Sequence, residues 1–517
     1  MYKIFITIIL LVSSVTAVSI DSLLVKSIGG VKGYEALKNL EIITTEGTVI
    51  LNGISGKFKQ IIKMPDKLYI EINMEDFSLI QGYDGITAWG KDLNGSYTEI
   101  TGYEKNNMLS TLYFDSFSNL SIGSVPGAYN YIGLVNYNND EFHQIDFYPL
   151  NLDTVSIYFD NNTGLRAISM SKLDNLNTIT TFSDYRTIND ILFPFYLHAT
   201  VESANLNTDF SVKTIQINQK ISDSIFNMPS QKPSNFFFPP ESSKVSVNID
   251  YKLGHLRIPV ILNGKRKLWM ILDSGASSTI YHKPAIEDLE LKVVGTIPAK
   301  GIGGYDDAEL VRVDSLKVGE IVLKNKLNGS LNMSGLNKST PNNDRFGGIL
   351  GYDFLSEFPT LIDYKNSIIT FYNPDSFEPL PNGIEIPFSL TMQVPTVVAS
   401  INGISGQFIV DLGNAFGLII HKPFYNQNKL ENIFENIKET DSKLKGIGKA
   451  TLRKSANATD FRMGKIKIDT LKVLIPESSG GISGSFEIAG NIGNLLLENY
   501  KILFDYKNLR LILYQSD

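Results

Sequence analysis

Two short motifs each place a carboxylate directly after an apolar run and directly before a glycine. They are Asp273-Ser274-Gly275 after Met270-Ile271-Leu272, and Asp411-Leu412-Gly413 after Phe408-Ile409-Val410. A carboxylate at the end of a buried strand loses solvent, which is unfavourable unless the residue has a purpose there. Two such carboxylates that face each other share one proton, and the ionised member can take a proton from water. The motifs therefore predict a site that activates a water molecule.

An internal repeat places the two motifs at equivalent positions. In each half an Asn-Gly turn precedes the Asp, His-Lys-Pro follows it, and two glycine-containing segments come before a closing Asp-Tyr-Lys-Asn. The matched pairs are Asn263-Gly264 and Asn402-Gly403, His282-Lys283-Pro284 and His421-Lys422-Pro423, Gly301-Ile302-Gly303 and Gly446-Ile447-Gly448, Gly348-Ile349-Leu350-Gly351 and Gly490-Asn491-Ile492-Gly493, and residues 363–366 and 505–508. Matches in the same order indicate a duplication in which each copy supplies one carboxylate.

The repeat resembles the retropepsin- and pepsin-like aspartic peptidases over roughly residues 244–517. The resemblance rests on Asp273-Ser274-Gly275-Ala276 together with Ile349-Leu350-Gly351, and more loosely on Asn491-Ile492-Gly493. It implies two related β-lobes, each with an Asp loop and an apolar strand ending in glycine behind that loop. The implied site residues are Asp273 and Asp411 for catalysis, Ser274, Gly275, Ala276, Gly413 and Asn414 for support of the loops, and Ile349, Leu350, Gly351, Ile492 and Gly493 for the strands behind them.

The segment Gly301, Ile302, Gly303 and Gly304 lies where such peptidases carry a flap over the substrate. A hinged flap would exclude water and clamp an extended peptide by strand pairing. A phosphate-binding loop is excluded, because no Lys-Ser/Thr follows the glycines and no βαβ pattern surrounds them. A plain hairpin tip is the alternative interpretation. Gly446-Ile447-Gly448 is the expected counterpart in the second half.

The second half departs from this family at Leu412, where the family has a Ser or Thr that hydrogen-bonds across to the partner loop. Ser274 alone retains such a hydroxyl, and each lost bond costs about 1 kcal/mol. The Asn414 side chain is expected to bond to the Asp411 carboxylate instead. Two alternatives stay open. In one, Asp411 is a remnant and Asp273 pairs with Asp273 of a second chain; in the other, the protein is an inactive pseudopeptidase that binds peptide or lipid.

The N-terminal part alternates apolar and polar residues in the manner of β-strands, with an Asn52-Gly53 hairpin turn. Helices are expected over residues 20–40, broken at Gly29-Gly30, and over residues 104–113. The region resembles the LolA/LolB-like lipoprotein-carrier fold, a curved antiparallel sheet with a helix in its concave face. The phrases that carry this likeness are Met64-Pro65-Asp66-Lys67, Gly82-Tyr83-Asp84-Gly85, Phe182-Ser183-Asp184-Tyr185 and Ile191-Leu192-Phe193-Pro194. The resemblance allows either a sheet that holds an acyl chain or peptide, or an accessory domain without a ligand.

These patterns predict a mainly β protein, with two acid-protease-like β-barrels after a curved antiparallel β-sheet domain of the α+β type. The predicted divisions are a signal peptide over 1–17, a LolA/LolB-like domain over 18–228, a proline-rich linker over 229–243, and peptidase lobes over 244–379 and 380–517. The apolar run after Lys3 ends in small residues at Ala17, as in a signal peptide, and an N-terminal membrane anchor is the alternative. No later segment reaches about 18 apolar residues, so no membrane span is expected after removal of the signal.

Composition narrows the chemistry further. The 517 residues carry a net charge of −7 without a block of like charge, so nucleic-acid binding has little support. No cysteine is present, which excludes disulfides, a cysteine nucleophile and cysteine-ligated zinc. The five histidines show no metal-binding spacing, and packing at strand ends is the expected role of His282 and His421. Neither a metal nor a cofactor is expected.

Taken together, the residues and the resemblance predict an exported aspartic-type endopeptidase, in a periplasm or outside the cell. Its expected partner is a peptide or protein substrate. A monomer with both carboxylates in one chain is expected, with a homodimer as the alternative.

Overall fold

The computed structural model describes residues 20–120, 128–174, 176–230, 236–333, 336, 340–448, 450–478 and 480–515. The predicted signal peptide lies outside these residues, as does 231–235 of the predicted linker. Within the described residues the strands form four sheets, which confirms the expected mainly β class. No helix among the same residues is long and apolar enough to cross a membrane.

The N-terminal part forms an antiparallel sheet of 13 strands in the order β6-β5-β4-β3-β2-β1-β13-β12-β11-β10-β9-β8-β7. The strands are β1 (Ile42–Leu51), β2 (Ile54–Lys63), β3 (Lys67–Met74), β4 (Ser78–Tyr83), β5 (Ala88–Lys91), β6 (Tyr97–Glu99), β7 (Tyr129–Tyr137), β8 (Asp140–Phe147), β9 (Val155–Asp160), β10 (Arg166–Leu173), β11 (Leu176–Ile188), β12 (Ile191–Val201) and β13 (Leu206–Ile217). Most neighbours are sequential hairpins, and β1 pairs with β13 to join the two series.

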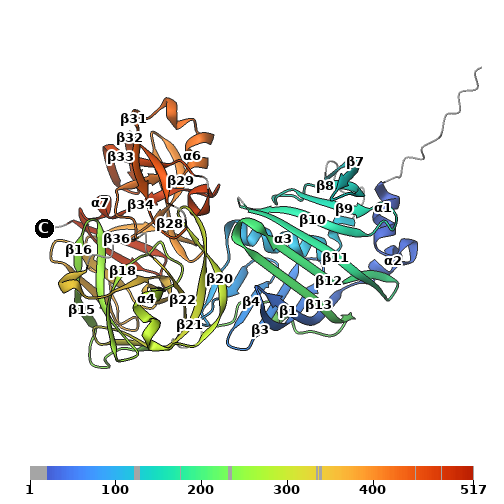
Figure 1. The fold of residues 1–517 in the computed structure, drawn as a ribbon, viewed down its shortest axis with the longest axis horizontal. Helices are drawn as coiled ribbons and strands as arrows, with labels where there is room; N and C mark the ends of the chain where they lie inside the picture. Colours follow the sequence, from blue (N-terminus) through green and yellow to red (C-terminus); the bar gives the residue numbers. More distant parts are fainter. Residues whose placement is uncertain are drawn as a thin grey trace, which may run out of the picture.

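Three helices accompany this sheet: α1 (Ile20–Ser27), α2 (Gly30–Leu37) and α3 (Gly102–Asp115). The predicted break between the first two occurs at Gly29, whose φ of 105° is accessible mainly to glycine. Met108 and Leu112 on α3 pack into the core of the sheet. Figure 1 shows α3 lying in the curve of the sheet, so the helix fills the concave face.

The first lobe is a sheet of nine strands ordered β14-β22-β19-β23-β18-β17-β21-β20, with β16 paired to β17. Its strands are β14 (Phe236–Phe237), β16 (Asp250–Lys252), β17 (His255–Leu262), β18 (Arg266–Leu272), β19 (Ile280–His282), β20 (Val293–Gly301), β21 (Gly304–Val318), β22 (Ile321–Leu331) and β23 (Phe346–Leu350), and its helices are α4 (Lys283–Ile286) and α5 (Tyr352–Leu355). Strand β23 runs parallel to β18 and antiparallel to β19. Within the predicted linker, Phe236 lies in β14, where its ring packs on Phe358.

The second lobe repeats this plan in a sheet of eight strands ordered β27-β28-β29-β34-β30-β33-β32-β31. Its strands are β27 (Ser389–Thr391), β28 (Val394–Ile401), β29 (Ile404–Val410), β30 (Leu418–Ile420), β31 (Glu435–Leu444), β32 (Thr451–Met463), β33 (Ile466–Pro476) and β34 (Ile488–Ile492), and its helices are α6 (Lys422–Gln427) and α7 (Asn494–Leu497). Strand β34 runs parallel to β29 and antiparallel to β30, as β23 does between β18 and β19. The two halves therefore share one topology around their Asp loops.

A fourth sheet joins the two lobes in the order β15-β25-β24-β35-β36-β26. Its strands are β15 (Lys244–Asn248), β24 (Thr360–Asp363), β25 (Ile368–Tyr372), β26 (Ile384–Pro387), β35 (Tyr500–Asp505) and β36 (Arg510–Gln515). The two Asp-Tyr-Lys-Asn segments form turns in its hairpins, where the carboxylates of Asp363 and Asp505 accept from the backbone N–H groups of Asn366 and Asn508. Because β24 pairs with β35, the last hairpins of both halves form one continuous platform.

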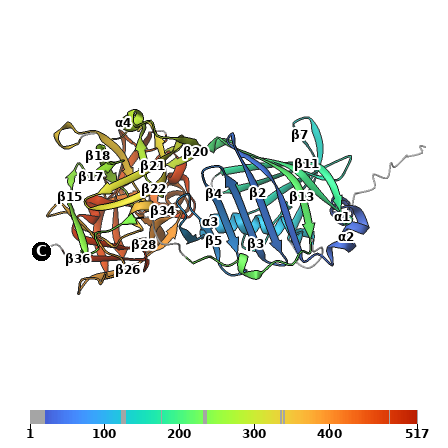
Figure 2. The ribbon, with the colours of Figure 1, turned by 90° about the horizontal axis from the view of Figure 1, so that it is seen from below.

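The N-terminal sheet packs against the first lobe through β20 and β21. Leu310 of β21 and Leu327 of β22 belong to the same apolar core as Val49 and Phe58 of the N-terminal sheet. The Lys292 ammonium lies 2.8 Å from the Asp76 carboxylate, and the Arg312 guanidinium donates to the Asp76 carbonyl over 2.7 Å. Both views place β20 beside the N-terminal sheet (Figure 1, Figure 2).

Candidate active site

The two Asp loops face each other and have the same local structure. Asp273 follows β18 and Asp411 follows β29, and each backbone N–H donates to the strand behind, to Leu350 O over 3.0 Å and to Ile492 O over 2.8 Å. An ideal Cβ on Gly413 would lie 2.3 Å from Asp273 Oδ2, and one on Gly275 would lie 2.7 Å from Asp411 Oδ1. Only glycine therefore lets each loop approach the carboxyl of the other.

The two carboxyls lie against each other's loops at the floor of one site. Asp273 Oδ1 accepts from the Gly275 N–H over 2.8 Å, and Asp411 Oδ1 accepts from the N–H groups of Gly413 and Asn414 over 2.9 Å and 3.0 Å. Burial, and then the charge of Asp411, raises the pKa of Asp273 well above its usual range. Burial also raises the pKa of Asp411. Such a pair holds one proton over a wide pH range and titrates as a unit.

The Ser274 hydroxyl hydrogen-bonds to the partner loop, whereas the Leu412 side chain has no group that could make the equivalent bond. The Ser274 hydroxyl donates to Val410 O over 2.6 Å and accepts from the Leu412 N–H over 3.0 Å. The Leu412 side chain is fully buried in the core shared by both lobes. One hydroxyl thus makes two bonds to the partner loop, while an apolar contact replaces the hydroxyl on the other side.

The predicted strands behind the loops lie in equivalent places. Gly351 and Gly493 pass so close to the loops that a Cβ would lie 2.6 Å from Ser278 O and 2.3 Å from Phe416 O. The carbonyls of Ala276 and Asn414 accept from the next helices, from the Tyr352 and Asn494 N–H groups over 2.9 Å each. The remaining residues of this set, Ile349, Leu350 and Ile492, are buried in β23 and β34.

The expected bond from the Asn414 side chain to Asp411 is absent among the described contacts, and Asn491 takes that place. The Asn414 amide nitrogen donates to Asn491 O over 3.1 Å, while the Asn414 oxygen accepts from the Phe416 N–H over 2.9 Å. The amide of Asn491 lies 2.6 Å from Asp411 Oδ2. Asn414 is instead held by its own tight turn, so only its backbone N–H reaches the carboxylate. In the repeat Asn491 aligns with the apolar Ile349, and this polar residue at an apolar position was the sequence signal that could have identified it.

The predicted flap is the hairpin of β20 and β21, with Ile302 and Gly303 at its tip. Gly303 forms a parallel bridge with Gly448, the expected counterpart in the second lobe. The Ser483 hydroxyl donates to Ile302 O over 2.7 Å, and a Cβ on Gly301 would lie 2.1 Å from Ile447 O. The two hairpin tips therefore meet above the carboxyls, in a closed arrangement.

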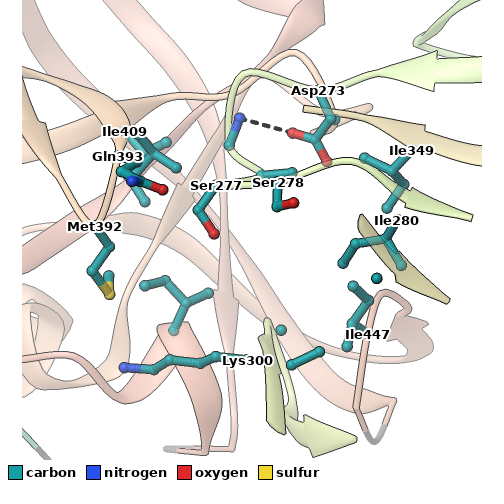
Figure 3. A pocket seen from close by; sticks show the side chains of 18 of the residues that line it. Asp273, Ser277, Ser278, Ile280, Lys300, Ile349, Met392, Gln393, Ile409 and Ile447 are labelled. Carbon is teal, nitrogen blue, oxygen red and sulfur yellow. Dashed lines mark hydrogen bonds between the residues drawn. The ribbon is translucent and has the colours of Figure 1, made fainter. Parts of the chain in front are cut away.

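Beneath the flap lies a cavity of about 1130 Å³ that contains both carboxyls. Figure 3 shows Asp273 on one wall, Lys300 of the flap on the opposite side, and Met392 and Gln393 of the second lobe at the left of the view. The N-terminal sheet and α3 also line the cavity, through Ile70, Ile72, Leu79, Ile100 and Glu104. The N-terminal domain therefore forms one side of the cavity that contains the two carboxyls.

Three acidic residues lie where the N-terminal domain, the flap and the second lobe meet: Glu104, Asp174 and Glu487. The Lys300 ammonium lies 3.3 Å from the Asp174 carboxylate, whose Oδ1 accepts from the Phe486 N–H over 2.9 Å. Burial, followed by the charge of Asp174, raises the pKa of Glu487 to about 7. Burial also raises the pKa of Glu104. This contact is therefore sensitive to protonation near neutral pH.

The matched histidines are both buried at strand ends. His282 Nδ1 lies 3.2 Å from the Met333 N–H, and His421 Nδ1 lies 3.1 Å from Ile488 O. His421 Nε2 also lies 2.7 Å from the Asn491 amide. Sequence reasoning did not foresee this last contact, because it joins residues from two separate strands.

Residues 258–354, which include Asp273 and most of the first lobe, match the family model described as aspartyl protease. The comparison with curated proteins found no match. Among solved structures, an aspartic proteinase from Irpex lacteus is 14% identical, with 53% of this chain and 98% of that chain covered and a TM-score of 0.36. A LolA superfamily protein from Nitrosomonas europaea is 8% identical, with 38% and 98% covered and a TM-score of 0.28. A DUF1329 family protein from Desulfovibrio piger is 13% identical, with 40% and 95% covered and a TM-score of 0.29.

Proposed function

We propose that this chain is an aspartic endopeptidase, which hydrolyses peptide bonds with a water molecule activated by Asp273 and Asp411. The observation that carries the proposal is that two equivalent loops bring the carboxyls of Asp273 and Asp411 together in one cavity. The match of residues 258–354 to the aspartyl protease model supports it further. Asp273 thus has its partner in the same chain, which favours a monomer over a site shared by two chains.

The mechanism follows from one proton shared by two carboxyls. The ionised carboxyl takes a proton from a water molecule, whose oxygen attacks the carbonyl carbon of the scissile bond. The protonated carboxyl donates a hydrogen bond to the carbonyl oxygen and stabilises the tetrahedral intermediate. The nitrogen of that intermediate then receives the proton that the carboxylate took from water, the C–N bond breaks, and the amine and the new carboxylic acid leave. The buried surroundings strengthen each of these interactions relative to water.

The substrate we propose is an extended peptide or protein segment that lies under the flap. The edge of the β20–β21 hairpin offers backbone groups for strand pairing, and the cavity beneath it is lined largely by apolar side chains. Because the tips of the two hairpins meet at Gly303 and Gly448, the flap must open before a peptide can enter.

The proposed setting is a periplasm or the space outside the cell. The apolar run that ends at Ala17 has the composition of a signal peptide. No nucleic acid and no cofactor enter the proposed reaction.

Cleavage of a mixed peptide library by purified residues 18–517, from about pH 3 to pH 7, tests the proposal. Asp273→Asn and Asp411→Asn are each expected to lower the rate by about 100-fold or more, because each removes a group that transfers or donates a proton. Loss of cleavage in Asp273→Asn but not in Asp411→Asn would point to a site formed by two chains. Sedimentation would then show a dimer.

A non-catalytic binding protein is the second candidate, because Leu412 breaks the symmetric exchange between the loops and the flap tips touch. In that case the folded parent chain would cleave no peptide at any pH tested. It would instead retain peptides or lipids with equal affinity in the parent and in Asp273→Asn.

A further inference from the structure

One face of the flap forms an apolar surface that runs from the carboxyls to the N-terminal sheet. Ala299 on β20 and Ala308 on β21 belong to the apolar cluster of Ile349, beside the Asp273 loop. On the same two strands, Ile297 and Leu310 pack into the core of the N-terminal sheet. Alternate residues of a strand point to one face, and Ala308 lies opposite Ile297 in the hairpin. The flap therefore connects the site to the N-terminal sheet by a continuous apolar surface.

The concave face of the N-terminal sheet extends this surface. Ile70 and Ile72 of β3 and Leu79 of β4 all line the cavity, and Ile72 lies directly opposite Leu79 in the sheet. Ile100, which follows β6, lines it as well. The side chains of Ile70, Ile72 and Leu79 are only half-buried, so apolar area is left for an occupant of the cavity.

Helix α3 lies on the same concave face, and its first turn touches the second lobe. The Thr101 hydroxyl, at the start of the helix, donates to Leu390 O over 3.0 Å. The Tyr103 hydroxyl contacts the sulfur of Met392, which lines the cavity next to the β27–β28 hairpin (Figure 3). The helix thus spans the distance between the N-terminal sheet and the second lobe.

The N-terminal domain is also attached to the first lobe. The Leu327 N–H on β22 donates to Asn94 Oδ1 over 2.8 Å, and the Asn94 amide donates to Leu327 O over 3.2 Å. The ion pair of Lys292 and Asp76 holds the base of the flap. The domain therefore contacts both lobes at the end of the cavity to which the flap surface leads.

This arrangement limits the length of chain that fits between the carboxyls and the N-terminal domain. An extended peptide advances by about 3.3 Å per residue, so each further residue brings it closer to the sheet and α3. Cavities of about 300–1,000 Å³ enclose most of a drug-sized ligand. The cavity of about 1130 Å³ thus has room for a short peptide segment.

We propose that the N-terminal domain closes one end of the substrate cleft, so that the peptidase cuts near one end of a chain. The short terminal segment of the substrate is apolar and lies against Ile70, Ile72 and Leu79. This inference rests on the proposed peptidase function and narrows its substrates to chains with a free end. The amino end and the carboxyl end fit the same geometry, and the test distinguishes them.

The test uses a set of peptides built on one library sequence that the parent chain cleaves. The sequence is offered alone, with a flexible tail of about ten Gly and Ser residues at the amino end or at the carboxyl end, and as a ring closed through the same linker. We expect one tail to be tolerated and the other to lower kcat/KM by about 100-fold or more, because a chain stopped at the wall cannot bring its scissile bond to the carboxyls. The ring has no end and should not be cleaved.

The tail that prevents cleavage identifies the end of the substrate that lies against the N-terminal domain. Parental cleavage of both tailed peptides, or cleavage of the ring, would overturn the inference and leave the peptidase function intact. If the parent chain cleaves no library peptide, the peptidase function is wrong. Fluorescence anisotropy with the same set, built on a library peptide that the parent retains, then tests the closed end by binding alone. Equal binding of all members, or no binding, would overturn it.

Ile72→Trp tests the wall itself in the full chain. The larger side chain fills apolar space at the closed end, so the released terminal segment should become shorter, and a peptide shortened at that end should become the better substrate. Ile132→Trp is the matched control, because Ile132 is 46% exposed on β7 at the far edge of the same sheet and should leave the products unchanged. Leu79→Trp gives the same readout from the neighbouring strand if Ile72→Trp does not fold. Parental product lengths in a folded variant would show that the substrate does not reach the sheet.

Discussion

Asp273 and Asp411 come from copies of one loop, but their surroundings differ. Asp411 accepts from the Asn491 amide and from two backbone N–H groups of its own loop, whereas Asp273 accepts from one such group, that of Gly275, and lines the cavity together with the apolar Ile349. Ser274 holds the loops together with one hydroxyl. At the scale of residues, the dyad is therefore unequal, although it arises from a repeat.

Removal of one dyad carboxyl should weaken the pH dependence of stability. Both folded-state pKa values are raised, so the folded chain binds more protons than the unfolded chain above the usual carboxyl pKa. Stability is then highest below that pKa and falls as pH rises through the folded values. We expect a smaller drop in Tm from about pH 4 to pH 8 in Asp273→Asn than in the parent. Asp375→Asn, at an exposed turn, should keep the parental drop; an equal drop in both variants would contradict the prediction.

Ser274→Ala should destabilise the chain by about 1–3 kcal/mol, because it leaves the buried Leu412 N–H without its partner. Urea denaturation of the variant and of Ser277→Ala measures the difference. Ser277 lines the same cavity (Figure 3), and its loss should change the free energy of unfolding by about 0.5 kcal/mol or less. Equal effects of the two substitutions would show that the bridge through Ser274 is unimportant.

At the scale of elements, the parallel strand behind each loop and the hairpin above it control the geometry. Strands β23 and β34 each insert between two strands of their lobe and accept the Asp N–H. The flap hairpin is held at its base by the N-terminal sheet and at its tip by the second lobe. Its closure therefore depends on contacts outside the lobe to which it belongs.

Gly301→Ala should impair closure of the flap, because the new Cβ would lie 2.1 Å from Ile447 O, a backbone atom that cannot move alone. We expect kcat/KM for peptide cleavage to fall about tenfold or more, since a lid that cannot close excludes water poorly. Gly417→Ala is the matched control, because its Cβ would meet no described atom closer than 3.8 Å. Parental kinetics in Gly301→Ala would show that the hairpin does not act as a lid.

At the scale of the whole molecule, three units meet at one cavity. The N-terminal sheet supplies a wall, the first lobe supplies Asp273 and the flap, and the second lobe supplies Asp411. Asp174 from the N-terminal domain pairs with Lys300 of the flap and accepts from Phe486 of the second lobe. The domain thus touches both lobes directly above the site.

Glu487→Gln should stabilise the protein at alkaline pH and have little effect in acid. Burial and Asp174 raise the pKa of Glu487 from 4.5 to about 7, so the folded state holds a proton that the unfolded state has released. This contribution is present below the unfolded pKa and is lost as pH rises through about 7. Differential scanning calorimetry at about pH 4 and pH 8 should show a higher Tm for the variant only at the higher pH.

The control for this measurement is Glu439→Gln, whose side chain is 82% exposed on the second lobe. It should leave Tm close to the parental value at both pH values. A higher Tm for Glu487→Gln at low pH as well would mean that removal of the Glu487 charge does not cause the stabilisation.

Local patterns in the sequence determined the strand-rich character, the duplication and the identity of the two Asp loops. These are statements about residue type and spacing, and a short segment contains all the information they need. The helix predicted over residues 104–113, which is observed over Gly102–Asp115, and the break at Gly29-Gly30 were predicted for the same reason.

Only the tertiary structure decided which side chains complete the site. The sequence suggested Asn414 as the partner of Asp411, but the tight turn at Asn414 directs its amide elsewhere, and Asn491 arrives on β34. The link to His421 and the cavity wall from Ile70 and Ile72 likewise join segments far apart in the chain. Such contacts depend on how strands stack and cross between lobes. Long-range packing sets those positions, so the local spacing of residues does not predict them.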